Sequence, residues 1–235
     1  MTIAYRGGNV ANNGISSTTA NVVLSLPLGS AVDDLAVAGI VCSANGVVMS
    51  SAPSGWTQLS ASPISGNAVT LYVYYKVLVA GDLIGTNKTW TVASAQRPCG
   101  VLVGFSGVDT TTPIEAQAMA NAAGATTQDA PAVTSLTSGA WILNLWAARD
   151  SSGGPPSITV PGSHTGRGTV ATGFASGGIN TAGAAGTLTT PGAAGTYGPY
   201  TASYAVSASG GMASMALKPA GGGGGPDPSQ FFALF

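Results

Sequence analysis

Short apolar runs, each about the length of one β-strand, recur along this chain and limit the folds open to it. The richest runs span 5 to 10 residues, far fewer than the roughly 20 that a membrane-spanning helix needs. They are bounded by Gly, Pro, Asn and Ser, the residues that favour turns between strands. The pattern therefore predicts an all-β fold of short strands. The four richest runs are Leu35–Cys42, Leu71–Ala80, Val101–Phe105 and Trp141–Ala148.

Two segments carry predictions about burial. Leu35–Cys42 is apolar throughout, as expected of a strand that is buried on both faces. Val69–Val79 is dense in β-formers, and alternate residues of a strand point to opposite faces. We expect its core face to carry Leu71, Val73, Tyr75 and Val77, and its wetter face to carry Thr70, Tyr72, Tyr74 and Lys76.

The second half of the chain repeats the plan of the first in weaker form. Gly139–Ala148 follows a turn as Leu35–Cys42 does, and Ile158–Thr165 resembles Pro53–Thr57. The last pair of strands is expected at Tyr200–Val206 and Gly211–Leu217. The prediction is a two-sheet antiparallel β-sandwich, of jelly-roll or immunoglobulin-like kind, built from two related halves.

Two segments depart from the strand pattern. Pro113–Ala123 is rich in Ala, Glu, Gln and Met, which favour helix, so we expect a loop with a helical turn or two there. Gly173–Gly198 contains almost nothing but Gly, Ala, Thr and Ser. A stretch of that length is expected to be either a long mobile loop or a region that orders against a partner.

Charged residues are scarce: Asp, Glu, Lys and Arg make up 6% of the 235 residues, and the net charge is −1. A typical soluble domain carries roughly 25%. No basic footprint for nucleic acid is present, and no polybasic surface for anionic lipid, so neither nucleic-acid binding nor membrane insertion is expected. A surface with so few charges is poorly protected against association, which favours a chain covered by neighbouring subunits.

The residues that usually carry chemistry are few. One His and two Cys supply neither a zinc-ligand set nor a disulfide framework. His164 lacks a nucleophile motif around it, so it is expected to be a turn or surface residue. Asp109 precedes Thr-Thr-Thr-Pro and is expected to form an Asx turn. Cys42 and Cys99 are expected to be buried free thiols. The prediction is a protein that is not an enzyme and needs no metal or cofactor.

Aromatic residues are the remaining candidates for ligand contact. Three of the four Trp residues fall in strand-like runs, where core packing is expected. Trp56 follows Pro53-Ser-Gly in a turn and is the Trp that could be exposed. A carbohydrate-binding module would need such exposed rings, and the candidates are Trp56, Tyr197 and Tyr200.

The last part of the chain differs in composition from residues 1–219, which form the predicted sandwich domain. Residues 220–230 are a Gly- and Pro-rich linker, which is expected to be flexible. Residues 231–235 read Phe-Phe-Ala-Leu-Phe, and an apolar plug of this kind left in water favours aggregation. We therefore expect this extended tail to act as a docking peptide, through Phe231, Phe232, Leu234 and Phe235.

A succession of motifs resembles a β-sandwich module of bacteriophage minor tail and other virion proteins, especially those of actinobacterial phages. The resemblance covers roughly Leu26 to Pro219, with motifs of moderate specificity that mark a fold rather than a reaction. The motifs are Gly29-x-x-x-Asp-Asp-Leu-Ala-Val-Ala38, Pro53-Ser-Gly-Trp-Thr-Gln-Leu59, Leu71-Tyr-Val-Tyr-Tyr-Lys-Val77, Thr89-Trp-Thr-Val92 and Val103-Gly-Phe-Ser-Gly-Val-Asp-Thr-Thr-Thr-Pro-Ile-Glu115.

This resemblance implies a phage virion structural protein, present in several copies and with no catalytic residues. The expected role is that of a minor tail protein of the tail tip or fibre, which would contact other virion proteins and a host surface glycan. By analogy with other phage appendages, a homotrimer is expected. The start of the chain shows no secretory signal, so assembly in the host cytoplasm is expected. Two alternatives stay open: a capsid decoration protein and a carbohydrate-binding adhesin module.

Overall fold

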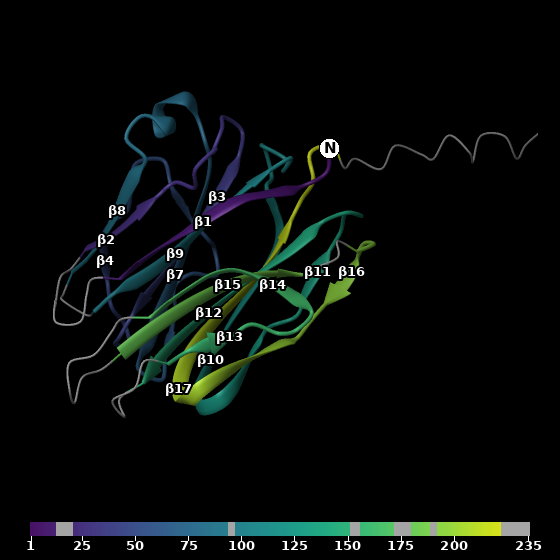
Figure 1. Ribbon diagram of the computed structural model, residues 1–235. Coiled ribbons are helices and arrows are strands. Elements are labelled where there is room, and N and C mark those ends of the chain that lie inside the picture. The colour runs from purple at the N-terminus through teal and green to yellow at the C-terminus, as the bar shows by residue number, and fades with distance from the viewer. Residues whose placement is uncertain (13–20, 94–96, 151–155, 172–179, 189–191, 222–235) are drawn as a thin grey trace, which may run out of the picture.

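The computed structural model describes residues 1–12, 21–93, 97–150, 156–171, 180–188 and 192–221 (Figure 1). These residues form antiparallel strands and one short 3-10 helix, η1, which confirms the all-β, sandwich-like prediction. The elements of the first half are β1 (Ala4–Asn12), β2 (Asn21–Ser25), β3 (Leu35–Cys42), β4 (Met49–Ser51), β5 (Thr57–Gln58), β6 (Ile64–Gly66), β7 (Val69–Val77), η1 (Ala80–Leu83), β8 (Asn87–Val92) and β9 (Cys99–Ser106). Those of the second half are β10 (Ile114–Ala130), β11 (Val133–Ser135), β12 (Trp141–Asp150), β13 (Ile158–Thr159), β14 (His164–Ala171), β15 (Asn180–Leu188), β16 (Gly195–Tyr197) and β17 (Tyr200–Leu217).

The first half has the strand order of a jelly roll. Its large sheet runs β1-β9-β3-β7-β5, with β6 also paired to β7, and its small sheet runs β2-β8-β4. The first strand thus pairs with the last, and the second strand pairs with the next to last. This nesting of strands is characteristic of jelly-roll folds, in which Greek keys connect two sheets.

The second half repeats this order, as the sequence predicts. Its large sheet runs β10-β17-β12-β15-β14, with β13 also paired to β17, and its small sheet is β11-β16. Again the first strand pairs with the last and the second with the next to last. The central strands β3 and β12 are therefore equivalent, which is the correspondence between Leu35–Cys42 and Gly139–Ala148 that the sequence suggests.

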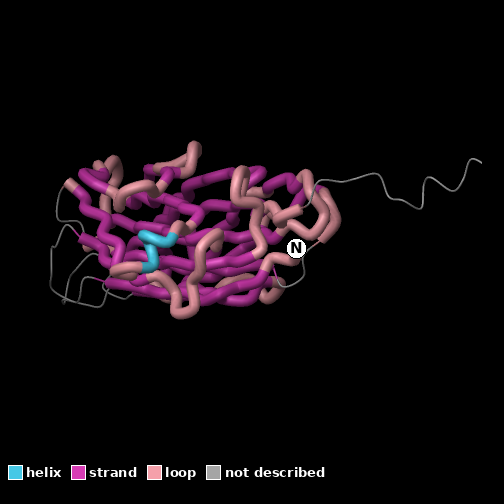
Figure 2. The backbone as a smooth tube through the Cα atoms, turned by 90° about the horizontal axis from the view of Figure 1, so that it is seen from above, coloured by secondary structure: helices cyan, strands magenta, loops and turns pink. Residues whose placement is uncertain are grey.

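The two halves pack large sheet on large sheet, which makes four layers rather than the predicted two (Figures 1 and 2). One core cluster lies between the large sheets and contains side chains of both halves, such as Val37 of β3 and Leu145 of β12. A second cluster fills the space between the large sheet of the first half and its small sheet, with Trp90 and Ile40 in it. Strand β3 is buried on both faces because its sheet lies between the other large sheet and the small sheet β2-β8-β4. The outer face of β12 is covered differently: Trp146 packs with Ile158 of β13 and Tyr204 of β17, and Ile142 packs with Val133 of β11.

The extra layer corrects the prediction for the strand at Val69–Val77. Thr70, Tyr72 and Tyr74, expected on a wetter face, are 0%, 5% and 3% exposed. Tyr72 and Tyr74 lie in the cluster under the small sheet, where the Tyr72 hydroxyl donates to the carbonyl of Val47 at 2.5 Å. The Thr70 hydroxyl donates to the carbonyl of Ala44 at 2.7 Å. Polar side chains at alternate positions of a strand are usually taken to face water. Here they face a second core, in which the hydroxyl groups of Thr70 and Tyr72 donate to backbone carbonyls.

Both long edges of the sheet-on-sheet contact are joined by side chains. On one edge the Arg167 guanidinium of β14 lies 4.2 Å from the ring centre of Tyr5 on β1. On the other edge the Asn121 amide of β10 donates to the carbonyl of Ser65 on β6 at 3.1 Å. The first strand of each half thus faces an edge strand of the other half, an arrangement with the reciprocity of a two-fold interface.

The prediction of a loop with a helical turn or two at Pro113–Ala123 is wrong. From Ile114 onward the segment belongs to β10, a 17-residue strand that pairs with β17 over most of its length. The Ala-rich sequence suits a helix locally, but here cross-strand pairing outweighs propensity. The expected break between Tyr200–Val206 and Gly211–Leu217 is also wrong, because both lie in the single 18-residue strand β17.

The segment Gly173–Gly198 includes a central strand rather than the expected mobile or partner-dependent region. Strand β15 lies between β12 and β14, and Asn180–Thr187 is buried. Its glycines have little space: a Cβ on Gly183 would lie 3.3 Å from Val41, on the facing sheet. Small residues are needed here for close packing, whereas residues 172–179 and 189–191 lie outside the described part.

The two cysteines are free and buried, as predicted. Cys99 is the cross-strand partner of Val41, so the adjacent Cys42 points to the opposite face of the sheet. The two thiols accordingly lie in different core clusters. Burial raises the pKa of each thiol to about 12, which makes both poor nucleophiles.

Candidate functional site

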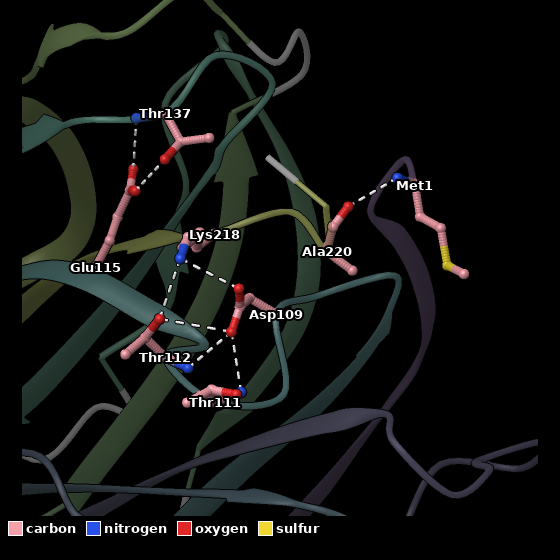
Figure 3. Close-up of polar contacts among 8 residues, drawn as sticks. All are labelled: Met1, Asp109, Thr111, Thr112, Glu115, Thr137, Lys218 and Ala220. Carbon is pink, nitrogen blue, oxygen red and sulfur yellow. Dashed lines mark hydrogen bonds and ion pairs between the residues drawn. The ribbon is translucent and has the colours of Figure 1, made fainter. Parts of the chain in front are cut away.

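The first and last described residues meet at one place on the surface, beside the connection between the halves (Figure 3). The N-terminal ammonium of Met1 donates to the carbonyl of Ala220 at 2.7 Å. The Ala220 N–H donates in turn to the carbonyl of Gly107 at 2.8 Å. The root of the 220–230 linker is therefore held at a defined position on the sandwich.

Asp109 holds the connection between the halves and forms the predicted Asx turn. Its Oδ1 accepts from the backbone N–H groups of Thr111 at 2.9 Å and Thr112 at 2.8 Å. Lys218, two residues before Ala220, pairs with its Oδ2 at 3.1 Å. The Thr112 N–H, then Lys218 and the Thr111 N–H, lower the pKa of Asp109 to about 2. The carboxylate is a structural anchor and stays ionised.

Glu115 plays the same part for the loop that follows β11. Its Oε1 accepts from the Leu136 and Thr137 N–H groups at 3.0 and 3.1 Å, and its Oε2 accepts from the Thr137 hydroxyl at 2.6 Å. Burial raises the pKa of Glu115, but the hydrogen bonds from Thr137, Ser135 and Leu136 outweigh that effect and hold it below the usual value. Figure 3 shows that the carboxylates of Asp109 and Glu115 both accept hydrogen bonds from residues of the same chain.

Two hollows flank the root of the linker. One, of about 180 Å³, is lined by Met1, Ser138, Gly139 and Gly221 among others. The other, of about 320 Å³, also includes Met1 and Ala220, and extends to Val32 in the loop between β2 and β3. The larger hollow is also lined by Arg6 and Asp34, which form an ion pair at 3.1 Å.

Large apolar side chains are exposed on the two loops beyond these hollows. Leu28 and Val32, in the β2–β3 loop, are 100% and 47% exposed; Val79 and Ile84, on either side of η1, are 55% and 82% exposed. We call these four residues the apolar end patch.

The two loops of the patch are tied together. The Leu26 N–H donates to the carbonyl of Thr86 at 3.0 Å, and the Asp33 N–H donates to the carbonyl of Leu78 at 2.9 Å. Between them lies a hollow of about 210 Å³, which we call the patch hollow. It is lined by Leu26, Pro27, Leu28, Gly29, Ser30, Leu83 and Thr86.

Sequence reasoning misses this patch, although a local signal exists. Leu28 and Ile84 each stand directly before a glycine with positive φ, Gly29 and Gly85. Glycine in that conformation marks a tight turn, and a turn is where a side chain has least cover. An apolar residue beside such a glycine is therefore a candidate for an exposed contact residue.

His164 is buried rather than at the surface, which corrects the prediction for it. Its side chain is 7% exposed, with Tyr200 edge-on at a ring separation of 4.5 Å. Nε2 lies 2.7 Å from the Asn144 side-chain oxygen, and the Asn144 amide donates to Ser214 at 2.6 Å. Asn144 therefore accepts from Nε2–H, which leaves Nδ1 to accept from the Ser163 hydroxyl at 3.1 Å.

The chemistry of this His-Asn-Ser group is that of a satisfied core network. Desolvation lowers the pKa of His164 to about 4, so the imidazole is neutral near pH 7. A base that weak accepts a proton from a serine poorly. None of the described hollows reaches these side chains.

Of the sequence-predicted site residues that the structure describes, Tyr197 and Tyr200 lie against one cluster and Trp56 lies in another. Trp56 is 8% exposed and packs edge-on against Trp90, with ring centres 5.0 Å apart, so the exposure that the sequence left open for it does not occur. Tyr197 and Tyr200 are half-buried side chains against the small core cluster beneath β11 and β16. The predicted docking residues Phe231, Phe232, Leu234 and Phe235 lie outside the described part of the chain.

Two further findings concern the described residues alone. Among them no helix has the length and apolar character to cross a membrane, and no group of three or more His, Cys, Asp or Glu side chains is arranged to hold a metal ion. Comparison with known proteins gives no further guide: no family model matches this chain, and no curated protein or solved structure is detectably similar to it.

Proposed function

We propose that this chain is a structural protein of a bacteriophage virion, a minor tail protein of the tail tip or fibre. The observation that carries the proposal is the apolar end patch beside the root of the linker. A fully exposed leucine next to exposed isoleucine and valine is a surface typical of protein contacts. Residues 231–235, with three Phe and one Leu, add a second apolar contact element on the same chain.

The fold and composition support the same proposal. Jelly rolls recur in viral capsid and lectin domains. With 6% charged residues, the chain is suited to a place where neighbours cover much of its surface. Its partners would then be other virion proteins and further copies of itself, with a trimer as the favoured assembly, and a host surface glycan as a further ligand.

Separation of purified particles tests the position of the protein. Heads and tails would be isolated and the protein quantified in each by mass spectrometry. Enrichment in tails supports the minor tail role, and enrichment in DNA-filled heads would instead indicate a capsid decoration protein, for which the same patch would serve equally well. Absence from particles contradicts both.

Incorporation of a truncated chain tests the docking segment. Loss of residues 231–235 should abolish incorporation and leave the domain folded, because the described core and hydrogen bonds lie within residues 1–221. Normal incorporation of the truncated chain would contradict the docking role. The carbohydrate-binding alternative is supported less, since Trp56 lies in the core and leaves Tyr197 and Tyr200 as its aromatic candidates.

A further inference from the structure

The patch hollow and the apolar segment of the same chain have matching chemistry. The hollow is open to solvent on one side, has a volume of about 210 Å³, and has a mainly apolar lining that includes Leu26, Pro27, Leu28 and Leu83. An apolar cavity of roughly 150 Å³ is large enough to bind benzene, so the volume of this hollow is sufficient for one phenyl ring. Residues 231–235 carry three such rings.

The linker also has the reach to bring the segment there. Ala220 and Val32 line the same hollow, so the root of the linker lies beside the β2–β3 loop. Leu28 is four residues from Val32, a separation of at most ~14 Å along the chain. Phe231 lies eleven positions after Ala220 in the chain, and a Gly-rich segment of that length has a root-mean-square span of about 17–20 Å.

We propose that residues 231–235 pack onto the apolar end patch of the same molecule in the free protein, with one phenyl ring in the patch hollow. A tethered segment has an effective concentration in the millimolar range when the span of its linker matches the distance. That favours the patch of the same chain over the patch of a neighbouring copy at ordinary protein concentrations.

The consequence for assembly rests on the proposed function. The free subunit would keep its two apolar contact elements against each other, and a virion partner would displace the segment and expose both together. The contact itself is tested on the isolated protein, so its failure is distinguishable from failure of the virion role, which particle fractionation tests.

Disulfide trapping in the full chain provides the test. The pair Thr86→Cys with Ala233→Cys places one thiol at the patch hollow, where Thr86 is exposed, and one in the segment. Cys42 and Cys99 are buried and do not compete. The matched control is Val48→Cys with Ala233→Cys, because Val48 is 63% exposed and lies beyond the other end of β3.

The expected result is an intramolecular disulfide that forms at least about tenfold faster in the Thr86 pair than in the control pair, because a segment docked on the patch holds the thiol of residue 233 beside residue 86 and away from residue 48. Adding Leu28→Glu to the Thr86 pair should remove this difference. Leu28 is fully exposed, so the fold does not depend on it.

Four outcomes would overturn the proposal. Equal rates in the two pairs would mean that the tether collides at random. No disulfide would mean that the segment does not reach the hollow. A disulfide-linked dimer would mean that the segment binds the patch of a neighbouring copy. An undiminished rate of disulfide formation with Leu28→Glu would mean that the segment does not bind the apolar end patch.

Discussion

The buried histidine makes stability depend on pH in a range where few other groups titrate. His164 is the chain's single histidine, and desolvation lowers its pKa from 6.5 to about 4 in the folded protein. In the unfolded chain the imidazole is solvated and takes up a proton near pH 6.5. Because the unfolded state binds the proton first, the free energy of unfolding falls as the pH drops from 6.5 towards 4 and levels off below that.

The magnitude follows from this difference in pKa. At ~1.4 kcal/mol per pKa unit, the loss of stability is at most about 2 kcal/mol at pH 5 and about 3 kcal/mol at pH 4. Asp109, whose pKa is lowered to about 2, loses its contribution only as the pH falls further. The range from pH 6.5 to 5 therefore isolates His164.

The assay is chemical denaturation at pH 7.5, 6 and 5 on the native chain and on His164→Gln. Glutamine can still donate to the Asn144 oxygen but does not titrate, so the variant should lose about 2 kcal/mol less than the native chain between pH 7.5 and 5. Identical pH profiles for the two proteins would refute the reasoning. That result would mean that the His164 imidazole is solvated in the folded protein, or that Asn144 and Ser163 accommodate its protonated form.

Three further predictions concern packing. Gly39→Val should lower the free energy of unfolding by about 1–3 kcal/mol, because even a Cβ at this position would lie 3.2 Å from Leu145 on the facing sheet. The control Gly81→Ala, where a Cβ meets open space, should cost much less. Equal melting temperatures for the two variants would contradict the close contact of the two large sheets. Trp56→Ala should cost about 3–5 kcal/mol in urea denaturation, and a variant that keeps its stability but loses glycan binding would restore the surface role. Arg167→Ala should lower the free energy of unfolding by about 0.5–2 kcal/mol through loss of the contact with the Tyr5 ring. Arg167→Lys should restore only part of that stability, because the planar guanidinium that stacks on the ring is lost. Full restoration in thermal melts would show that the positive charge alone matters.

The local predictions that hold are those that rest on a single strand or turn. Leu35–Cys42 is buried on both faces because every side chain in it is apolar or absent, so either face suits a core. Asp109 forms its turn with residues two and three positions away. Interactions of this kind are encoded within a few residues, and a sequence is sufficient to predict them.

The predictions that fail depend on neighbours far away in the chain. Pro113–Ala123 becomes strand β10 because it pairs with β17, roughly a hundred residues on. Tyr72 and Tyr74 are buried because β2, β4 and β8 cover that face. No local preference distinguishes a polar face under another sheet from one in water.

The sequence by itself determines an all-β chain of two similar halves, because strand-sized apolar runs and turn residues are local signals that recur in both. Only the tertiary structure decides that the halves pack large sheet on large sheet, that the Gly- and Ala-rich strand β15 lies in the middle, and that His164 is buried while Leu28 is exposed. The physical reason is that burial belongs to an arrangement of layers: a side chain is covered or left open by strands distant in sequence, and their pairing is settled by packing rather than by the residues beside it.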